Sequence, residues 1–438
     1  MGNVTNLQGS FTASRVYYEE SLVFRREIGD KAGISATLNN LGILALEQGD
    51  YAAAQALHEE SLALRSEMGD KLGISNSLNN LGYVALEQDD YATARALLEE
   101  SLALCREMGD KRGIAYSLSI LGKVVLEQGD FPAAQALHEE SLALYREMGD
   151  KRGTSASLNN LGVLALEQGN YAEALTLCEE SLALRREIGD KWGISDSLSS
   201  LGKLALSQGE YAAAKLLCEE SLALCREMGN KRCLAFSLSI LGSVALAQVD
   251  NSVARTLHEE SLVLRRELGD KRGIATSLSN LGYVALEQGD CDAARAQLEE
   301  SLALCKKMDE KTIMAYVLLG LGIVDLVENK PEAHEYISHS LSLLQDRGEQ
   351  MPLISSLIGA AGLALQEGNP QFAAQLLGAV ESALKMLHAK MVPEMIHFHA
   401  KTQAAAREQL GESVFQSAWE EGAGWALEKT VTKALAGV

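Results

Sequence analysis

The sequence predicts an all-α protein: a right-handed superhelical solenoid of antiparallel helix pairs, closed by a C-terminal helical cap. A 40-residue pattern repeats along most of the 438-residue chain, and its glycine recurs from Gly2 to Gly362. Within each copy, apolar residues recur every three or four positions in two separate runs, which is the spacing of amphipathic helices. Helix pairs of this kind stack on their neighbours and bury a continuous core.

The register of the pattern divides the chain into four parts. We expect a truncated first repeat at residues 1–30, seven full repeats at 31–310, two degenerate repeats at 311–390 and a helical cap at 391–438. Met1 stands midway through a first helix, where the seven full copies have leucine. A solenoid end without a cap exposes apolar surface. We therefore expect that the chain is part of a longer protein and that this end self-associates.

Turn residues mark the helix ends in each copy. Gly49 and Asp50 separate the two helices of the copy that begins at Lys31. Gly69 stands where a helix C-cap favours positive φ, and Asp70 is a suitable N-cap for the next helix. A glycine inside a helix, such as Gly42, costs about 1 kcal/mol relative to alanine. We expect close packing of the two helices to offset that cost.

The copies resemble tetratricopeptide repeats in their longer form. The matching residues are Leu41-Gly42, Gly49-Asp50-Tyr51 and the small residue Ala54. This resemblance implies a concave groove that binds a protein or an extended peptide.

The C-terminal tail resembles the extreme C-terminus of bacterial STAND-type signalling ATPases and related transcriptional regulators. The matching residues are Leu376-Leu377-Gly378-Ala379, Gly411-Glu412, Phe415, Ala418-Trp419, Glu421-Gly422 and Leu427-Glu428. The resemblance implies a sensor or regulatory arm that follows an NTPase or regulatory domain. The sequence itself contains no G-x-x-x-x-G-K-[ST] motif, so an NTPase domain would lie outside it.

No motif indicates catalysis. Neither HExxH nor G-x-S-x-G occurs. His58, His138 and His258 share one position with Leu98 and Cys178, which indicates packing and not chemistry. The paired glutamates recur in every full copy, which indicates a solvent-exposed acidic stripe and not a catalytic pair. We expect a protein that is not an enzyme and holds neither a cofactor nor a metal.

The composition indicates which partners and which cellular location to expect. A net charge of −21 disfavours direct binding to nucleic acid. No apolar run approaches the length of a membrane helix, and no signal peptide is evident, so we expect a soluble cytoplasmic protein. The 7 cysteines stand singly within helical segments, and we expect reduced, mostly buried thiols.

Specificity is expected where the copies differ. Four positions of the first helix lie about opposite the stripe that faces the second helix. They begin at Ala36, Asn40, Ile43 and Glu47 and recur every 40 residues. We call the first three of them the first, second and third rows. Asparagines of the second row suit a peptide backbone, because an amide both donates and accepts hydrogen bonds.

The predicted groove residues are these asparagines, the apolar residues that interrupt their row or stand beside it, and neighbouring lysines or tyrosines. They are Asn40, Asn80, Tyr83, Tyr116, Ile120, Lys123, Asn160, Lys203, Phe236, Ile240, Asn280 and Tyr283. Such pockets would favour a ligand with apolar side chains beside acidic groups. Two alternatives remain open: these residues only pack between copies, or the chain is a passive scaffold or oligomerisation module.

Overall fold

The computed structural model describes residues 11–345, 347 and 349–437, and these residues form helices without strands. The predicted partial helix at residues 1–8 lies outside the described residues. The paired helices are α2 (Phe11–Glu27), α3 (Lys31–Glu47), α4 (Tyr51–Met68), α5 (Lys71–Glu87), α6 (Tyr91–Met108), α7 (Lys111–Glu127), α8 (Phe131–Glu147), α9 (Lys151–Glu167), α10 (Tyr171–Glu187), α11 (Lys191–Ser207), α12 (Tyr211–Met228), α13 (Lys231–Ala247), α14 (Asn251–Leu268), α15 (Lys271–Glu287), α16 (Cys291–Met308), α17 (Lys311–Val327), α18 (Ala333–Leu344), α19 (Gln350–Gln366) and α20 (Pro370–Met386). The C-terminal helices are α21 (Pro393–Leu410), α22 (Glu412–Ala423) and α23 (Leu427–Gly437).

The predicted helix ends are confirmed. Gly69 ends α4 in the left-handed conformation, with φ 67°. The Asp70 carboxylate accepts a hydrogen bond from the Gly73 backbone N–H at 3.0 Å and so caps α5. Asn230 caps α13 in the same way, through the backbone N–H of Cys233 at 3.0 Å. Each cap satisfies a donor that would otherwise be unpaired at a helix N-terminus.

The expected close approach within a helix pair is also confirmed. A Cβ atom added at Gly42 would lie 2.6 Å from the Cε1 atom of His58, so no larger residue fits there without a shift. Ala54, at the start of the second helix, is fully buried. The glycine therefore admits the second helix at a distance that alanine would prevent.

Buried polar side chains join each pair to the next. The Ser61 hydroxyl donates to the backbone oxygen of Ser35 at 2.9 Å and lies 3.3 Å from the hydroxyl of Ser77, so it links α3, α4 and α5. The Arg65 guanidinium crosses the same junction and donates to the backbone oxygen of Gly73 at 2.6 Å. Both side chains satisfy buried groups on neighbouring helices, which makes their removal costly.

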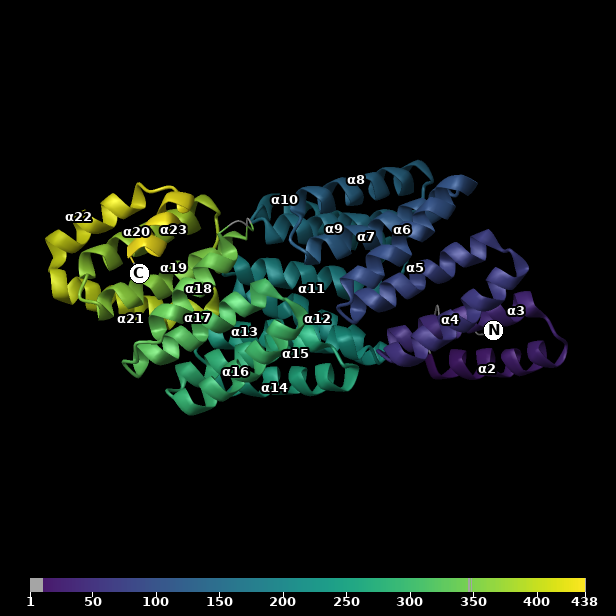
Figure 1. Cartoon of the computed structure of the whole chain (residues 1–438), viewed down its shortest axis with the longest axis horizontal. Coiled ribbons are helices and arrows are strands. Elements are labelled where there is room, and N and C mark those ends of the chain that lie inside the picture. The colour runs from purple at the N-terminus through teal and green to yellow at the C-terminus, as the bar shows by residue number, and fades with distance from the viewer. Residues whose placement is uncertain (1–10, 346, 348, 438) are drawn as a thin grey trace.

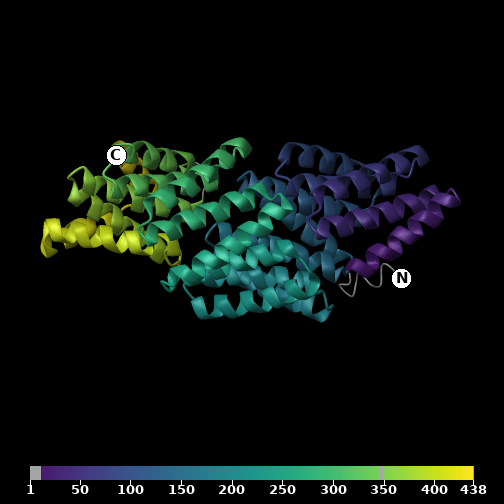
Figure 2. The same cartoon turned by 90° about the horizontal axis from the view of Figure 1, so that it is seen from below.

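The pairs stack into a right-handed superhelix, an elongated body with the N-terminal pairs and the cap at opposite ends (Figures 1 and 2). Helices α3, α5, α7, α9, α11, α13, α15 and α17 each contact the next member of this series. The even-numbered helices from α4 to α16 make no comparable contact with one another within the described chain. The odd-numbered helices therefore form the inner face of the superhelix. None of the helices described here is long and apolar enough to cross a membrane.

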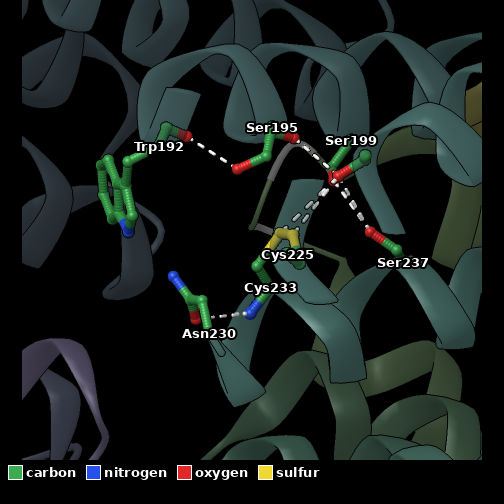
Figure 3. The surroundings of a disulfide bond; sticks show 8 residues. Trp192, Ser195, Ser199, Cys225, Asn230, Cys233 and Ser237 are labelled. Atoms are coloured by element: carbon green, nitrogen blue, oxygen red, sulfur yellow. Dashed lines mark hydrogen bonds between the residues drawn. A yellow bond between two sulfur atoms is a disulfide. The ribbon is translucent and has the colours of Figure 1, made fainter. Parts of the chain in front are cut away.

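The expectation that every cysteine is a free thiol is wrong for one pair. Cys225 and Cys233 form a disulfide between α12 and α13 (Figure 3). They stand singly in the sequence, but the tight turn between the helices brings their Cα atoms to 5.8 Å, a typical distance for a disulfide. The other cysteines are free: Cys105, Cys178, Cys218, Cys291 and Cys305.

Candidate functional site

The second row is occupied by contacts between neighbouring inner helices. The Asn80 side-chain amide donates to the amide oxygen of Asn39 at 2.8 Å, on the preceding inner helix, α3. Asn160 and Asn280 donate to serine hydroxyls of their preceding helices in the same way. Asn40 is half-buried at the equivalent place. The predicted asparagine ladder thus connects inner helices to one another.

The isoleucines of the second row lie in the core. Ile120 and Ile240 are 3% and 6% exposed. Each belongs to an apolar cluster with leucines of its own and neighbouring helices. Packing between copies therefore also explains why isoleucine replaces asparagine at these two positions of the second row.

The aromatic residues of the first row are accessible. Tyr116 on α7 and Phe236 on α13 are each 40% exposed, whereas Leu238 on the same helix is 1% exposed. An exposed aromatic ring on an inner face is a typical anchor for a bound segment, because such rings bring a large contact area at little conformational cost.

Contacts of Arg232 join α5 to this region. The Arg232 guanidinium, one turn before Phe236, forms an ion pair with Glu87 and a hydrogen bond with the Tyr83 hydroxyl. Tyr83 and Tyr116 also lie close enough to interact electrostatically. The first turn of α13, one turn before Phe236, is thereby joined to α5, and Tyr83 of α5 lies near Tyr116 of α7.

The two predicted lysines differ. Lys203 Nζ lies 2.6 Å from a carboxylate oxygen of Glu167. Burial would raise the pKa of Glu167, but pairing with Lys203 outweighs it and lowers that pKa. Lys123 takes part in none of the ion pairs of the described residues. Burial lowers the pKa of its ammonium group, and the nearby Asp196 only partly offsets this.

The connector between α20 and α21, together with the start of α21, covers the far end of the inner face. The backbone N–H of Lys390 donates to the backbone oxygen of Ser207 at 2.9 Å. The Ser243 hydroxyl donates to a carboxylate oxygen of Glu394 at 3.2 Å. Helix α21 contacts α13 and α15. Accordingly, Tyr283 is 3% exposed and its hydroxyl donates to the backbone oxygen of Tyr316 at 2.8 Å.

Two inner-face arginines are not among the residues that the sequence indicates. Arg232 and Arg272 stand one turn before the first row, and they pair with Glu87 and Glu127 at the predicted Glu47 position. Arg272 forms ion pairs with Glu127 and, at 3.3 Å, with Glu310. The change between arginine and uncharged residues at the Arg232 position was the available signal, but the carboxylate partner of each inner-face arginine lies 145 residues away along the chain.

No catalytic or metal site emerges from the described residues. None of their His, Cys, Asp and Glu side chains form a group of three suited to a metal ion. His58, His138 and His258 are fully buried against inner-helix glycines, as the packing interpretation predicts. Two recesses of about 700 and 660 Å³ are lined by turn and C-terminal residues, and neither includes a predicted groove residue.

A solenoid of helix pairs with a partly open inner face defines a repeat protein of the interaction type. The tetratricopeptide repeat model matches residues 1–67, 73–147, 153–227 and 233–307. These matches cover more than half of the chain, and the protein belongs to the tetratricopeptide repeat family.

Solved structures are similar to this chain at low sequence identity, and the likeness to the first of the following shows the shared fold. A Rap protein complexed with competence and sporulation factor is 12% identical, with a TM-score of 0.63 over 81% of this chain and 98% of the other. The apo form of the quorum sensor NprR from B. thuringiensis is 17% identical, with a TM-score of 0.50 over 78% and 99%. A STAND protein with a tetratricopeptide repeat sensor from Pyrococcus horikoshii is 14% identical, with a TM-score of 0.48 over 76% and 52%. No curated protein matches this sequence.

Proposed function

We propose that this chain recognises an extended peptide or protein segment on the inner face between α5 and α13, and that it does so without catalysis. The observation that carries the proposal is the exposure of two aromatic residues of the first row, Tyr116 and Phe236, with Lys123 two turns after Tyr116 on α7. The rings would receive apolar side chains of the ligand. Lys123, which lacks an ion pair within the described chain, would meet an acidic group.

The covered end of the inner face supports this location. Tyr283 and Ser243 are buried beneath the C-terminal segment, whereas Tyr83 and Lys123 of the same row are only half-buried. The Rap protein, which shares the fold, was solved with competence and sporulation factor bound. A bound segment is therefore compatible with a solenoid of this shape.

We also infer, from the resemblance of the C-terminal tail, that the chain is the sensor or regulatory arm of a larger signalling protein. Binding on the inner face would then bias an upstream NTPase or regulatory domain. Sequencing the gene upstream of Met1 tests this inference. An in-frame P-loop supports it, and a stop codon without such a domain contradicts it.

A peptide array of random 12-residue segments tests the binding proposal. We expect bound peptides to be enriched in apolar residues next to Asp or Glu. Phe236→Ala should weaken their binding about 30-fold, which corresponds to about 2 kcal/mol. Lys123→Gln should remove the preference for acidic residues.

Leu216→Ala is the matched control, because Leu216 is 68% exposed on α12 and belongs to the outer layer of the solenoid. This variant should bind like the wild type. Equal binding by the wild type, Phe236→Ala and Lys123→Gln would contradict the proposed site. Binding lost equally in Leu216→Ala would do the same.

A further inference from the structure

We propose that Cys225 and Cys233 form a reversible thiol–disulfide switch that fixes or frees the start of α13 and, through it, the contact between α13 and α5. The two residues end α12 and begin α13 (Figure 3). The proposal does not depend on what the inner face binds.

Comparison of the copies singles out this junction. The Cys225 position is filled by arginine in several copies, and the Cys233 position is glycine in every other full copy. Arg265 shows the usual arrangement, since its guanidinium donates to the backbone oxygen of Gly273 at 2.6 Å and ties two consecutive pairs together. Cysteine occurs at both positions only at this junction between two consecutive copies. The disulfide thus replaces a non-covalent tie with one that a reductant can open.

The junction adjoins a contact that spans the superhelix. Arg232, directly before Cys233, pairs with Glu87 and hydrogen-bonds to Tyr83, both on α5. Asn230 caps the same turn of α13. With the disulfide closed, this turn is fixed on α12 and presents Arg232 to α5. When the disulfide is reduced, no arginine is present to make the hydrogen bond found at other junctions. Only the Asn230 cap and packing then hold the first turn of α13.

Accessibility gives the two thiols different roles. Cys225 is fully buried, whereas Cys233 is half-buried. Cys233 therefore reacts first with a small disulfide such as glutathione disulfide. Its thiolate attacks one sulfur, the S–S bond of glutathione disulfide breaks, and one glutathione thiolate leaves.

Ring closure then completes the exchange. The Cys225 thiolate attacks the Cys233 sulfur, and the second glutathione thiolate leaves. The protein dithiol is oxidised, one glutathione disulfide is reduced, and the two protons end on two glutathione molecules. A dithiol reductant reverses the reaction.

The test uses the full chain with Cys291→Ser, which removes the one other cysteine that is not fully buried. The protein is equilibrated with glutathione disulfide or with dithiothreitol. Alkylation and mass spectrometry count the free thiols, and hydrogen exchange follows residues 234–240 and 80–87. We expect two fewer thiols after oxidation. We also expect exchange roughly tenfold slower in both segments, because the cross-link restricts local opening.

Two variants control the comparison. Cys225→Arg with Cys233→Gly copies the Arg265–Gly273 tie and should exchange alike in both buffers. Cys225→Ser with Cys233→Ser should match the reduced protein in both buffers. The proposal is overturned if both thiols remain alkylatable in glutathione disulfide. It is equally overturned if the bond forms but exchange in residues 80–87 stays unchanged.

Discussion

The three buried histidines make the fold sensitive to acid, and this sensitivity has a predictable size. His58, His138 and His258 are fully buried, and neither ring nitrogen of any of them has a hydrogen-bond partner. Burial, reinforced by a nearby cation, lowers their pKa values from 6.5 to about 4 for His58 and to about 3 for the other two. Each folded pKa thus lies below the unfolded one. The stability is fully present above pH 6.5 and is lost as pH falls toward the folded values.

The magnitude follows from proton linkage. At about pH 5 an unfolded histidine is almost fully protonated while the folded one is neutral, so each residue costs about 2 kcal/mol relative to neutral pH. The chain itself supplies a replacement, because Leu98 fills the same position against Gly82. Changing all three histidines to leucine should therefore remove about 6 kcal/mol of the acid destabilisation, without leaving a cavity or an unpaired nitrogen.

Thermal melts of the wild type and the triple variant, followed by circular dichroism, measure this effect. The midpoint of the wild type should fall more steeply than that of the variant between about pH 7.5 and about pH 5. His339→Leu is the control, because His339 is exposed on α18, and it should retain the wild-type dependence. If the triple variant loses as much stability on acidification as the wild type, the histidines are not the source and the reasoning fails.

Three further predictions concern the inner face and the ends. Phe236→Ala should cost less stability than Leu238→Ala, for which about 2–5 kcal/mol is expected; equal melting temperatures would place Phe236 in the core. A double-mutant cycle of Arg232→Ala and Glu87→Ala, measured by denaturation, should give a coupling of about 1 kcal/mol; additive losses would mean that the ion pair does not stabilise the superhelix. Hydrogen exchange should be slower in residues 71–270 than at both ends, because outer pairs have one neighbour and fray first; uniform protection would contradict this.

The sequence predicts the helices, their caps and the buried side of each pair, because these depend on contacts within 40 residues. It also places Leu238 in the core and Phe236 at the surface, as the structure confirms. The sequence does not predict the contact of Arg232 with Glu87. That contact depends on the pitch of the superhelix, which accumulates from small rotations at several junctions. The sequence could have indicated the Cys225–Cys233 pair, since alignment of the copies shows the two substitutions on either side of one junction between consecutive copies.

A comparison of identical residues at equivalent repeat positions shows whether the repeat itself or distant contacts determine how exposed a residue is. Tyr83 and Tyr283 stand in the third row of nearly identical helices, yet Tyr83 is half-buried and Tyr283 is 3% exposed. Their own copies cannot explain the difference. Distant neighbours can. Helix α21 contacts α15 and Tyr283 donates to Tyr316, whereas Tyr83 meets only the arginine side chain of Arg232 from α13 among the more distant helices named above. The repeat therefore determines where an inner-face residue stands, while the winding of the superhelix and the docking of the cap determine whether it is available to a ligand.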